Sequence, residues 1–200
     1  MASFSKTPAA KAPLLGSATT EGIVIIKVGP DGVKYHFHKS LLVHHSEYFR
    51  KALSGPWKEA EGDLVTLDDV EPCIVTLFVH WLYTQQLPLD NNEWVRMEIV
   101  EEKQYWRDEW LHVCFKAYVF GDRFLVPKLS RVVNNLFAET LNSCYYSDKP
   151  GLLSACYAFD KIPSNCIILQ CLVDLYCAYY SPSRLGYDLT AMDVLPLTFL

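Results

Sequence analysis

The fold is decided between residues 22 and 42, which read Gly22-Ile-Val-Ile-Ile-Lys-Val-Gly-Pro-Asp-Gly-Val-Lys-Tyr-His-Phe-His-Lys-Ser-Leu-Leu42. The run Ile23–Val28 is rich in β-branched residues and has the length of a strand. It is followed by Gly29-Pro-Asp-Gly32, a dense cluster of turn formers. From Val33 to His38 apolar and polar residues alternate, so that one face of a second strand packs inward. We therefore predict that the two strands form a hairpin.

Two short helices, a third strand and a longer helix are predicted to follow. Ser40 and Ser46-Glu47 are N-cap candidates for the short helices, and Gly55-Pro56 ends the second of them. Leu64-Val-Thr-Leu67 has the composition of a short strand. Glu71-Pro72 places proline at the first position of the longer helix. The apolar residues of that helix recur at helical spacing: Ile74, Leu77, Phe78, Trp81 and Leu82.

The two ends of the chain and one internal segment differ from this pattern. Residues 1–20 hold few bulky apolar residues, so burial cannot offset chain entropy and a disordered arm is predicted. Residues 91–109 are acidic and rich in tryptophan, which suggests an insertion whose structure the sequence does not define. The main domain is predicted over 21–142. Residues 143–200 carry further helical stripes and form a C-terminal extension, which ends like a helix entrance cut short.

Composition excludes several function classes. The 200 residues are 50% hydrophobic, enough for one core, and 18 basic against 23 acidic side chains give a net charge of −5. No global positive field attracts a phosphate backbone, so direct nucleic-acid binding is not expected. Neither a secretion signal nor the ~18 apolar residues of a membrane helix is found. Seven Cys, an odd number without a Cys-x-x-Cys pair, fit a reducing compartment, so we expect a soluble chain in the cytoplasm, the nucleus or both.

No residue pattern predicts an active site, a metal site or a cofactor. His36 and His38 share one strand face, but a third ligand at recognisable spacing is missing. His44 and His45 point about 100° apart on a helix, which favours surface or interface roles over a shared metal. The cysteines in apolar helical stretches are interpreted as buried small hydrophobes: Cys73, Cys114, Cys156 and Cys171. Phosphate-binding and nucleophile-turn motifs are also missing, so the chain is not expected to be an enzyme.

Five motifs, in register over about residues 22–141, resemble those of the BTB/POZ family. His38-Lys-Ser-Leu-Leu42 resembles the family's His-Lys/Arg-x-x-Leu, and Ser46-Glu-Tyr-Phe49 resembles Ser-x-x-Phe. Val70-Glu-Pro72 resembles the opening of the family's long helix, and Trp81-Leu-Tyr-Thr84 is similar to the Tyr-Thr-Gly that closes it. Ala117-Tyr-Val-Phe-Gly-Asp-Arg-Phe-Leu-Val-Pro-Lys-Leu129 resembles Ala-Asp-x-(Tyr/Phe)-x-(Ile/Val)-x-x-Leu. The segment after Tyr48 most resembles the short stand-alone BTB proteins of filamentous fungi.

The resemblance implies an α+β fold, in which a small sheet of three or more strands is flanked by a helical cluster and followed by a helical C-terminal extension. It implies a protein-interaction module that self-associates as a homodimer or a BTB hetero-oligomer and is a candidate adaptor for a cullin-based ubiquitin ligase. The family positions expected to be structural are His38, Lys39, Phe49 and Asp122.

The resemblance also assigns two contact surfaces. The residues on the helices that BTB modules use to dimerise are Leu41, Leu42, His45 and Tyr48, with core packing as the alternative for both leucines. The candidate cullin contacts are Trp57, Glu59 and Tyr83. There the apolar side chain of Trp57 would anchor in a desolvated pocket and the carboxylate of Glu59 would accept a charge-assisted hydrogen bond at its edge. The alternative is that Trp57 covers the rim of the core.

One departure bears on a second function, that of a nuclear transcription cofactor acting through the dimer groove. Many BTB repressors place an aspartate before the first strand, where it meets the basic residue after the histidine. Here Gly22 holds that place, preceded by Glu21, so Lys39 is expected to lack its partner. This departure favours the adaptor over the cofactor.

Overall fold

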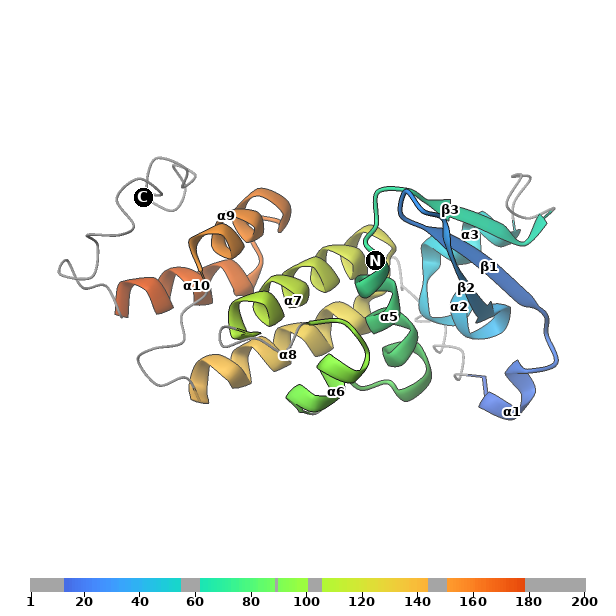
Figure 1. Cartoon of the computed structure of the whole chain (residues 1–200), viewed down its shortest axis with the longest axis horizontal. Coiled ribbons are helices and arrows are strands. Elements are labelled where there is room, and N and C mark those ends of the chain that lie inside the picture. The colour runs from blue at the N-terminus through green and yellow to red at the C-terminus, as the bar shows by residue number, and fades with distance from the viewer. Residues whose placement is uncertain (1–12, 55–61, 89, 101–105, 144–150, 179–200) are drawn as a thin grey trace, which may run out of the picture.

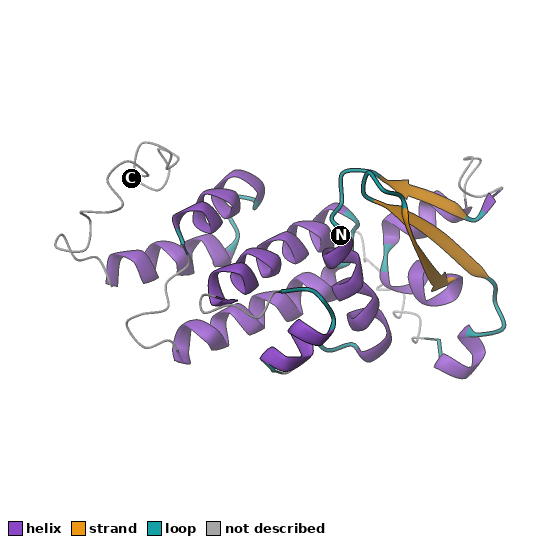
Figure 2. Cartoon of the chain, viewed as in Figure 1, coloured by secondary structure: helices purple, strands orange, loops and turns teal. Residues whose placement is uncertain are grey.

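The computed structural model describes residues 13–54, 62–88, 90–100, 106–143 and 151–178. A small sheet and the short helices beside it lie at one end, further helices lie in the middle, and the last two helices lie at the other end (Figure 1). Figure 2 shows the strands gathered in the sheet and the helices filling the remainder. The predicted α+β class is confirmed.

The sheet has the order β2-β1-β3. Strands β1 (Ile23–Val28) and β2 (Val33–His38) pair antiparallel, with Ile26 opposite Tyr35, so the predicted hairpin is confirmed. The turn needs glycine, because Gly29 and Gly32 have φ of 69° and 64°. Strand β3 (Leu64–Leu67) runs parallel to β1 on its other side.

Three helices surround the inner face of the sheet. α2 (Lys39–His45) and α3 (Glu47–Ser54) are the two predicted short helices, and α5 (Pro72–Thr84) begins with proline as expected. The predicted cap of α2 is wrong, because His38 holds the N-cap position and Ser40 lies within the helix. Phe37 of β2 is fully buried, and its ring lies 5.8 Å from that of Phe78 on α5. The sheet and α5 therefore share one aromatic core.

The remaining helices extend this core toward the C-terminus. α7 (Trp106–Arg123) and α8 (Pro127–Ser143) form a hairpin joined by a short elbow at 124–126. α9 (Leu152–Lys161) packs on α7, and α10 (Ile167–Ala178) packs on α8 and α9. The helical character predicted for the C-terminal extension is thereby confirmed. The predicted domain bounds, 21–142 and 143–200, stay predictions.

The acidic insertion is folded where it is described. Residues Asn91–Arg96 form α6, capped by Asp90, whose carboxylate accepts a hydrogen bond from the backbone N–H of Glu93 at 3.0 Å. Trp94 is 3% exposed, and its indole N–H donates to the carbonyl of Pro88 at 3.1 Å. The segment contributes to the core because a tryptophan whose N–H donates to a carbonyl can be buried without leaving that N–H unsatisfied.

One helical turn, α1 (Leu15–Ala18), lies within the predicted disordered arm. The hydroxyls of Ser17, Thr19 and Thr20 each donate to a backbone carbonyl three residues earlier, at 2.8 Å. Ala18 is fully buried. The arm thus differs from the prediction over this turn, and residues 1–12 lie outside the described part.

Candidate functional site

The strand-to-helix junction at His38 is fastened to the end of α5. Nδ1 of His38 lies 2.7 Å from the hydroxyl oxygen of Tyr83. The backbone N–H of His38 donates to the same oxygen at 3.4 Å, and the two rings meet edge to face. The hydroxyl of Tyr83, a predicted cullin contact, is therefore held within this chain by His38.

Lys39 has an acidic partner that the sequence does not reveal. Its Nζ lies 2.5 Å from a carboxylate oxygen of Asp63, and both side chains are partly exposed. Asp63 directly precedes β3, and its carbonyl accepts the N–H of Ile25 on β1 at 2.8 Å. Parallel pairing of β3 with β1 thus brings the carboxylate to Lys39. The expectation that Lys39 lacks a partner, drawn from Gly22, is wrong.

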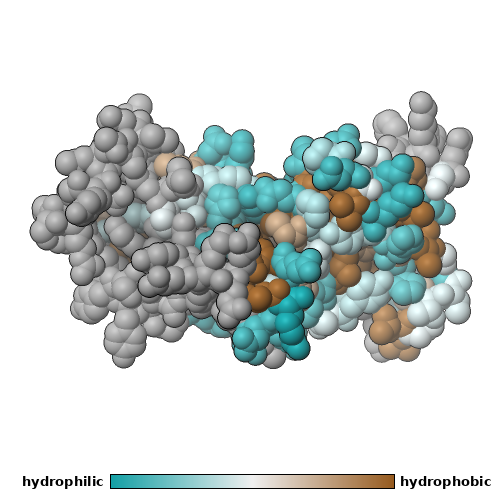
Figure 3. Space-filling view, in the orientation of Figure 1, coloured by the Kyte–Doolittle hydropathy of each residue, from teal (hydrophilic) through white to brown (hydrophobic). Residues whose placement is uncertain are grey.

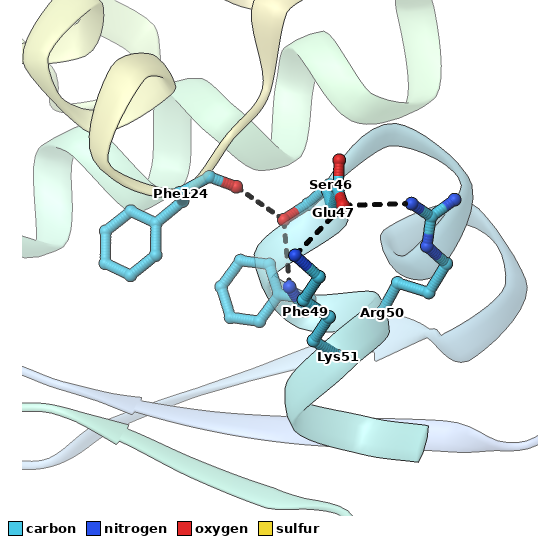
Figure 4. A network of polar contacts seen from close by, with 6 residues as sticks. All are labelled: Ser46, Glu47, Phe49, Arg50, Lys51 and Phe124. Atoms are coloured by element: carbon cyan, nitrogen blue, oxygen red, sulfur yellow. Dashed lines mark hydrogen bonds and ion pairs between the residues drawn. The ribbon is translucent and has the colours of Figure 1, made fainter. Parts of the chain in front are cut away.

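A buried serine joins the α2–α3 hairpin to the α7–α8 elbow (Figure 4). The hydroxyl of Ser46 donates to the carbonyl of Phe124 at 2.6 Å and accepts the N–H of Phe49 at 3.0 Å. The second bond confirms the predicted N-cap of α3. The rings of Phe49 and Phe124 stack with centroids 5.5 Å apart. We call these three residues the Ser46 junction.

The candidate dimer residues differ in exposure. Leu41 is 5% and Leu42 is 0% exposed, so both side chains belong to the core of their own chain, the alternative that the sequence left open. His45 is also buried, whereas Tyr48 is 39% exposed. Further exposed apolar residues lie on the strands, among them Ile23, Val33 and Leu64. Figure 3 shows apolar patches between polar ones at the sheet end. Self-association through this set stays a prediction, with Tyr48 as its exposed member.

The proposed cullin surface is only partly described. Trp57 and Glu59 lie outside the described residues, so neither its position nor its contacts are stated. Tyr83 is half-buried at the end of α5. This surface stays a prediction from the sequence.

A pocket of about 630 Å³ opens beside the Ser46 junction, between the α2–α3 hairpin and the α7–α8 hairpin. We call it the elbow pocket. From the first hairpin it is lined by His44, His45, Glu47 and Arg50. The facing side chains include Asp122 of α7, Leu125 of the elbow, and Ser130, Arg131 and Asn134 of α8. The family position Asp122 is exposed, and its carbonyl accepts the N–H of Leu125 at 3.1 Å.

Both histidines of the pocket favour the neutral form. The pKa of His45 is lowered to about 4, first by burial and then by the charges of His44 and Lys128. Burial, followed by the charge of Lys128, also lowers the pKa of His44. Sequence reasoning proposed these residues as surface or interface groups but missed the pocket, because its other wall lies more than 70 residues away.

Four cysteine thiols in the described part of the chain have a raised pKa. Burial is the largest cause that raises the pKa of the thiols of Cys73, Cys114, Cys156 and Cys171. A reactive thiolate needs the opposite shift. Within the described ranges no group of three or more potential metal ligands comes together, and no helix is both long and apolar enough to span a membrane.

The comparisons with known proteins bear on the sheet end. A family model for the BTB/POZ domain matches residues 24–103, which extend from β1 past α6. No curated protein matches the chain. Residues 24–103 therefore match a BTB/POZ domain, a kind of protein–protein interaction module, and the α+β fold agrees with that match. Helices α7 and α8, which the sequence resemblance included, lie beyond the matched residues.

Proposed function

We propose that this chain is a non-catalytic, self-associating adaptor of the cytoplasm or nucleus, related to the short stand-alone BTB proteins of fungi, that bridges a client to a cullin-based ubiquitin ligase. The BTB/POZ match to residues 24–103 carries the proposal, because that domain acts by binding proteins. The raised pKa values of the thiols Cys73 and Cys114 support the non-catalytic part.

Self-association is tested first. The exposed ring of Tyr48 packs edge-on against Phe124, with centroids 5.1 Å apart, so it is presented rigidly at the surface. We expect light scattering to give the mass of a dimer for the wild type and of a monomer for Tyr48→Asp. Ile167→Asp on α10, at a position that is 66% exposed, is the matched control and should stay dimeric. A wild-type monomer at 100 µM, or a dimer in Tyr48→Asp, contradicts this interface.

The cullin step is tested by calorimetry against the N-terminal region of a cullin. We expect the wild type to bind and the double variant Trp57→Ala/Glu59→Ala to lose at least tenfold in affinity without unfolding. His36→Ala, an exposed substitution on β2, should bind as the wild type does. Absence of binding by the wild type contradicts the adaptor proposal and leaves the BTB/POZ assignment intact.

The second candidate, a transcription cofactor, is favoured by the Lys39–Asp63 ion pair. The resemblance associates such an acid–base pair with the groove of BTB repressors, and Asp63 supplies the acid that residue 22 does not. We expect Lys39→Glu to abolish repression by the tethered chain in a reporter assay and the charge swap Lys39→Asp/Asp63→Lys to restore part of it. A tethered wild type that does not repress contradicts this function.

A further inference from the structure

The elbow pocket holds polar atoms that the fold leaves without partners. Nδ1 of His45, Oγ of Ser130 and Oδ1 of Asn134 are buried and make no hydrogen bond within the described part of the chain. His45 as a whole is 8% exposed. Each such atom costs about 1–3 kcal/mol if nothing satisfies it, which is why native proteins hold few of them. Their gathering around one pocket indicates that the pocket is built to bind something.

The charges around the pocket favour an anion. The carboxylate of Glu47 is compensated by Lys51 at 3.1 Å and by Arg50 at 3.6 Å. Arg131 lines the pocket without an ion pair to any described residue. Lys128 adds a positive charge that both histidines sense. Asp122 contributes the opposing carboxylate, so the excess charge on this wall is positive and lies on α8.

One rim of the pocket is apolar. Leu125 is 47% exposed and lines the pocket next to Pro127. The ring of Tyr48, which is 39% exposed, packs edge to face against the ring of Phe124, the residue before Leu125. An occupant with a carboxylate and a neighbouring apolar side chain would thus match both the charged wall and this rim. The pocket volume, about 630 Å³, lies within the usual range for ligand sites.

We propose that the elbow pocket binds an acidic peptide segment of a protein partner. The segment places its carboxylate on Arg131, with the hydroxyl of Ser130 as a second donor, and its apolar side chain on Leu125. A backbone N–H of the segment donates to Oδ1 of Asn134. Ser130 and Asn134 are half-buried, so their side chains reach the segment by the rotamer changes that are common at interfaces. The proposal does not require the adaptor function.

The proposal is tested by NMR titration of the ¹⁵N-labelled full chain with acetyl-Leu-Glu-Leu-amide, and with acetyl-Leu-Gln-Leu-amide as the neutral control. We expect the acidic peptide to shift the amide signals of residues 44–50 and 125–134 and to bind about tenfold more tightly than the neutral one. Equal affinities, shifts confined to other residues, or no shifts at millimolar peptide would overturn the proposal. So would concentration-dependent shifts of these signals without peptide, because they would show that a second copy of the chain fills the pocket.

Three variants separate binding from folding. Arg131→Glu should weaken binding of the acidic peptide at least tenfold, while Arg96→Glu, on the exposed face of α6, should leave it unchanged. Ser130→Ala should weaken binding about threefold and melt at the wild-type temperature or above, because it removes a polar atom that the free chain does not satisfy. Equal losses in both arginine variants, or a Ser130→Ala that binds as the wild type does, would contradict the assignment.

Discussion

The Ser46 junction and the elbow pocket lie side by side on the same two helical hairpins, but their buried polar groups differ in whether they form hydrogen bonds. Ser46 is fully buried and its hydroxyl makes two hydrogen bonds, one to each hairpin. His45, one residue earlier, is nearly as buried, and its Nδ1 has no hydrogen-bond partner among the described residues. A satisfied polar group fixes the geometry of the junction, whereas an unsatisfied one at a pocket costs stability until a ligand pairs with it.

The largest effect on stability is expected in the Ser46 junction. Phe49→Ala should lower the free energy of unfolding by about 3–5 kcal/mol, because it removes a fully buried ring stacked on Phe124 and leaves a cavity. Urea denaturation measures this change. Tyr48→Ala, the adjacent and partly exposed aromatic, is the matched control and should cost less than about 1.5 kcal/mol. Similar losses for both residues would mean that the junction is not packed as the structure has it.

Ser46→Ala tests the polar part of the junction. The variant leaves the carbonyl of Phe124 and the N–H of Phe49 without their partner, and we expect a loss of about 2–3 kcal/mol in the same denaturation experiment. Ser130→Ala is the comparison from the pocket side and should not lower the free energy of unfolding, because its hydroxyl has no hydrogen-bond partner in the described part of the chain. Equal destabilisation by the two serine variants would remove the distinction between junction and pocket.

Strand β2, the cap of α3 and the start of α5 could be predicted from the sequence, because local patterns specify each of them. Alternation in Val33–His38, the cap at Ser46 and the proline at Pro72 each act within a few residues, and each predicted element is present. The partner of Lys39 could not be predicted in this way. Asp63 reaches it only because β3 pairs parallel to β1, and strand order is not encoded in any local pattern.

The pocket and the insertion escaped prediction for a related reason. The elbow pocket exists because α8 docks against α2 and α3 from about 85 residues away, and no periodicity in α8 identifies its partner. Trp94 sits in an acidic segment whose composition suggests exposure. Its burial depends on a carbonyl at Pro88 and on the ring of Trp110, which lies 6.0 Å away. Tertiary contacts override composition at these positions.

Part of the pH dependence of stability follows from His45. The pKa of His45 is about 4 in the folded chain and 6.5 when unperturbed, so as pH falls the unfolded state binds a proton before the folded state does. Stability is therefore full above about pH 6.5, declines as pH falls, and levels off below about pH 4. The expected loss is about 1–3 kcal/mol, from 1.36 kcal/mol per pKa unit reduced for partial solvent access.

His45→Gln isolates this contribution from that of the carboxylates, which also lose stabilising charge in acid. The difference in unfolding free energy between wild type and variant should shrink or reverse from pH 7 to pH 5. Parallel stability curves for the two proteins over that range would show that His45 is not held neutral by its surroundings.

The smallest expected effect concerns an ion pair between the end of α7 and the segment before α5. Arg123 donates two hydrogen bonds to Asp69, at 2.6 and 3.1 Å, and its guanidinium carbon lies 5.0 Å from the ring centroid of Phe124. Both partners of the pair are about half-exposed or more, so Arg123→Ala should cost only about 0.5–1 kcal/mol. The cost should fall further in 1 M salt, where screening weakens the charge term and spares the ring contact. A salt-independent loss above 2 kcal/mol would show instead that this pair shares the structural role of the Ser46 junction, since buried hydrogen bonds are insensitive to screening.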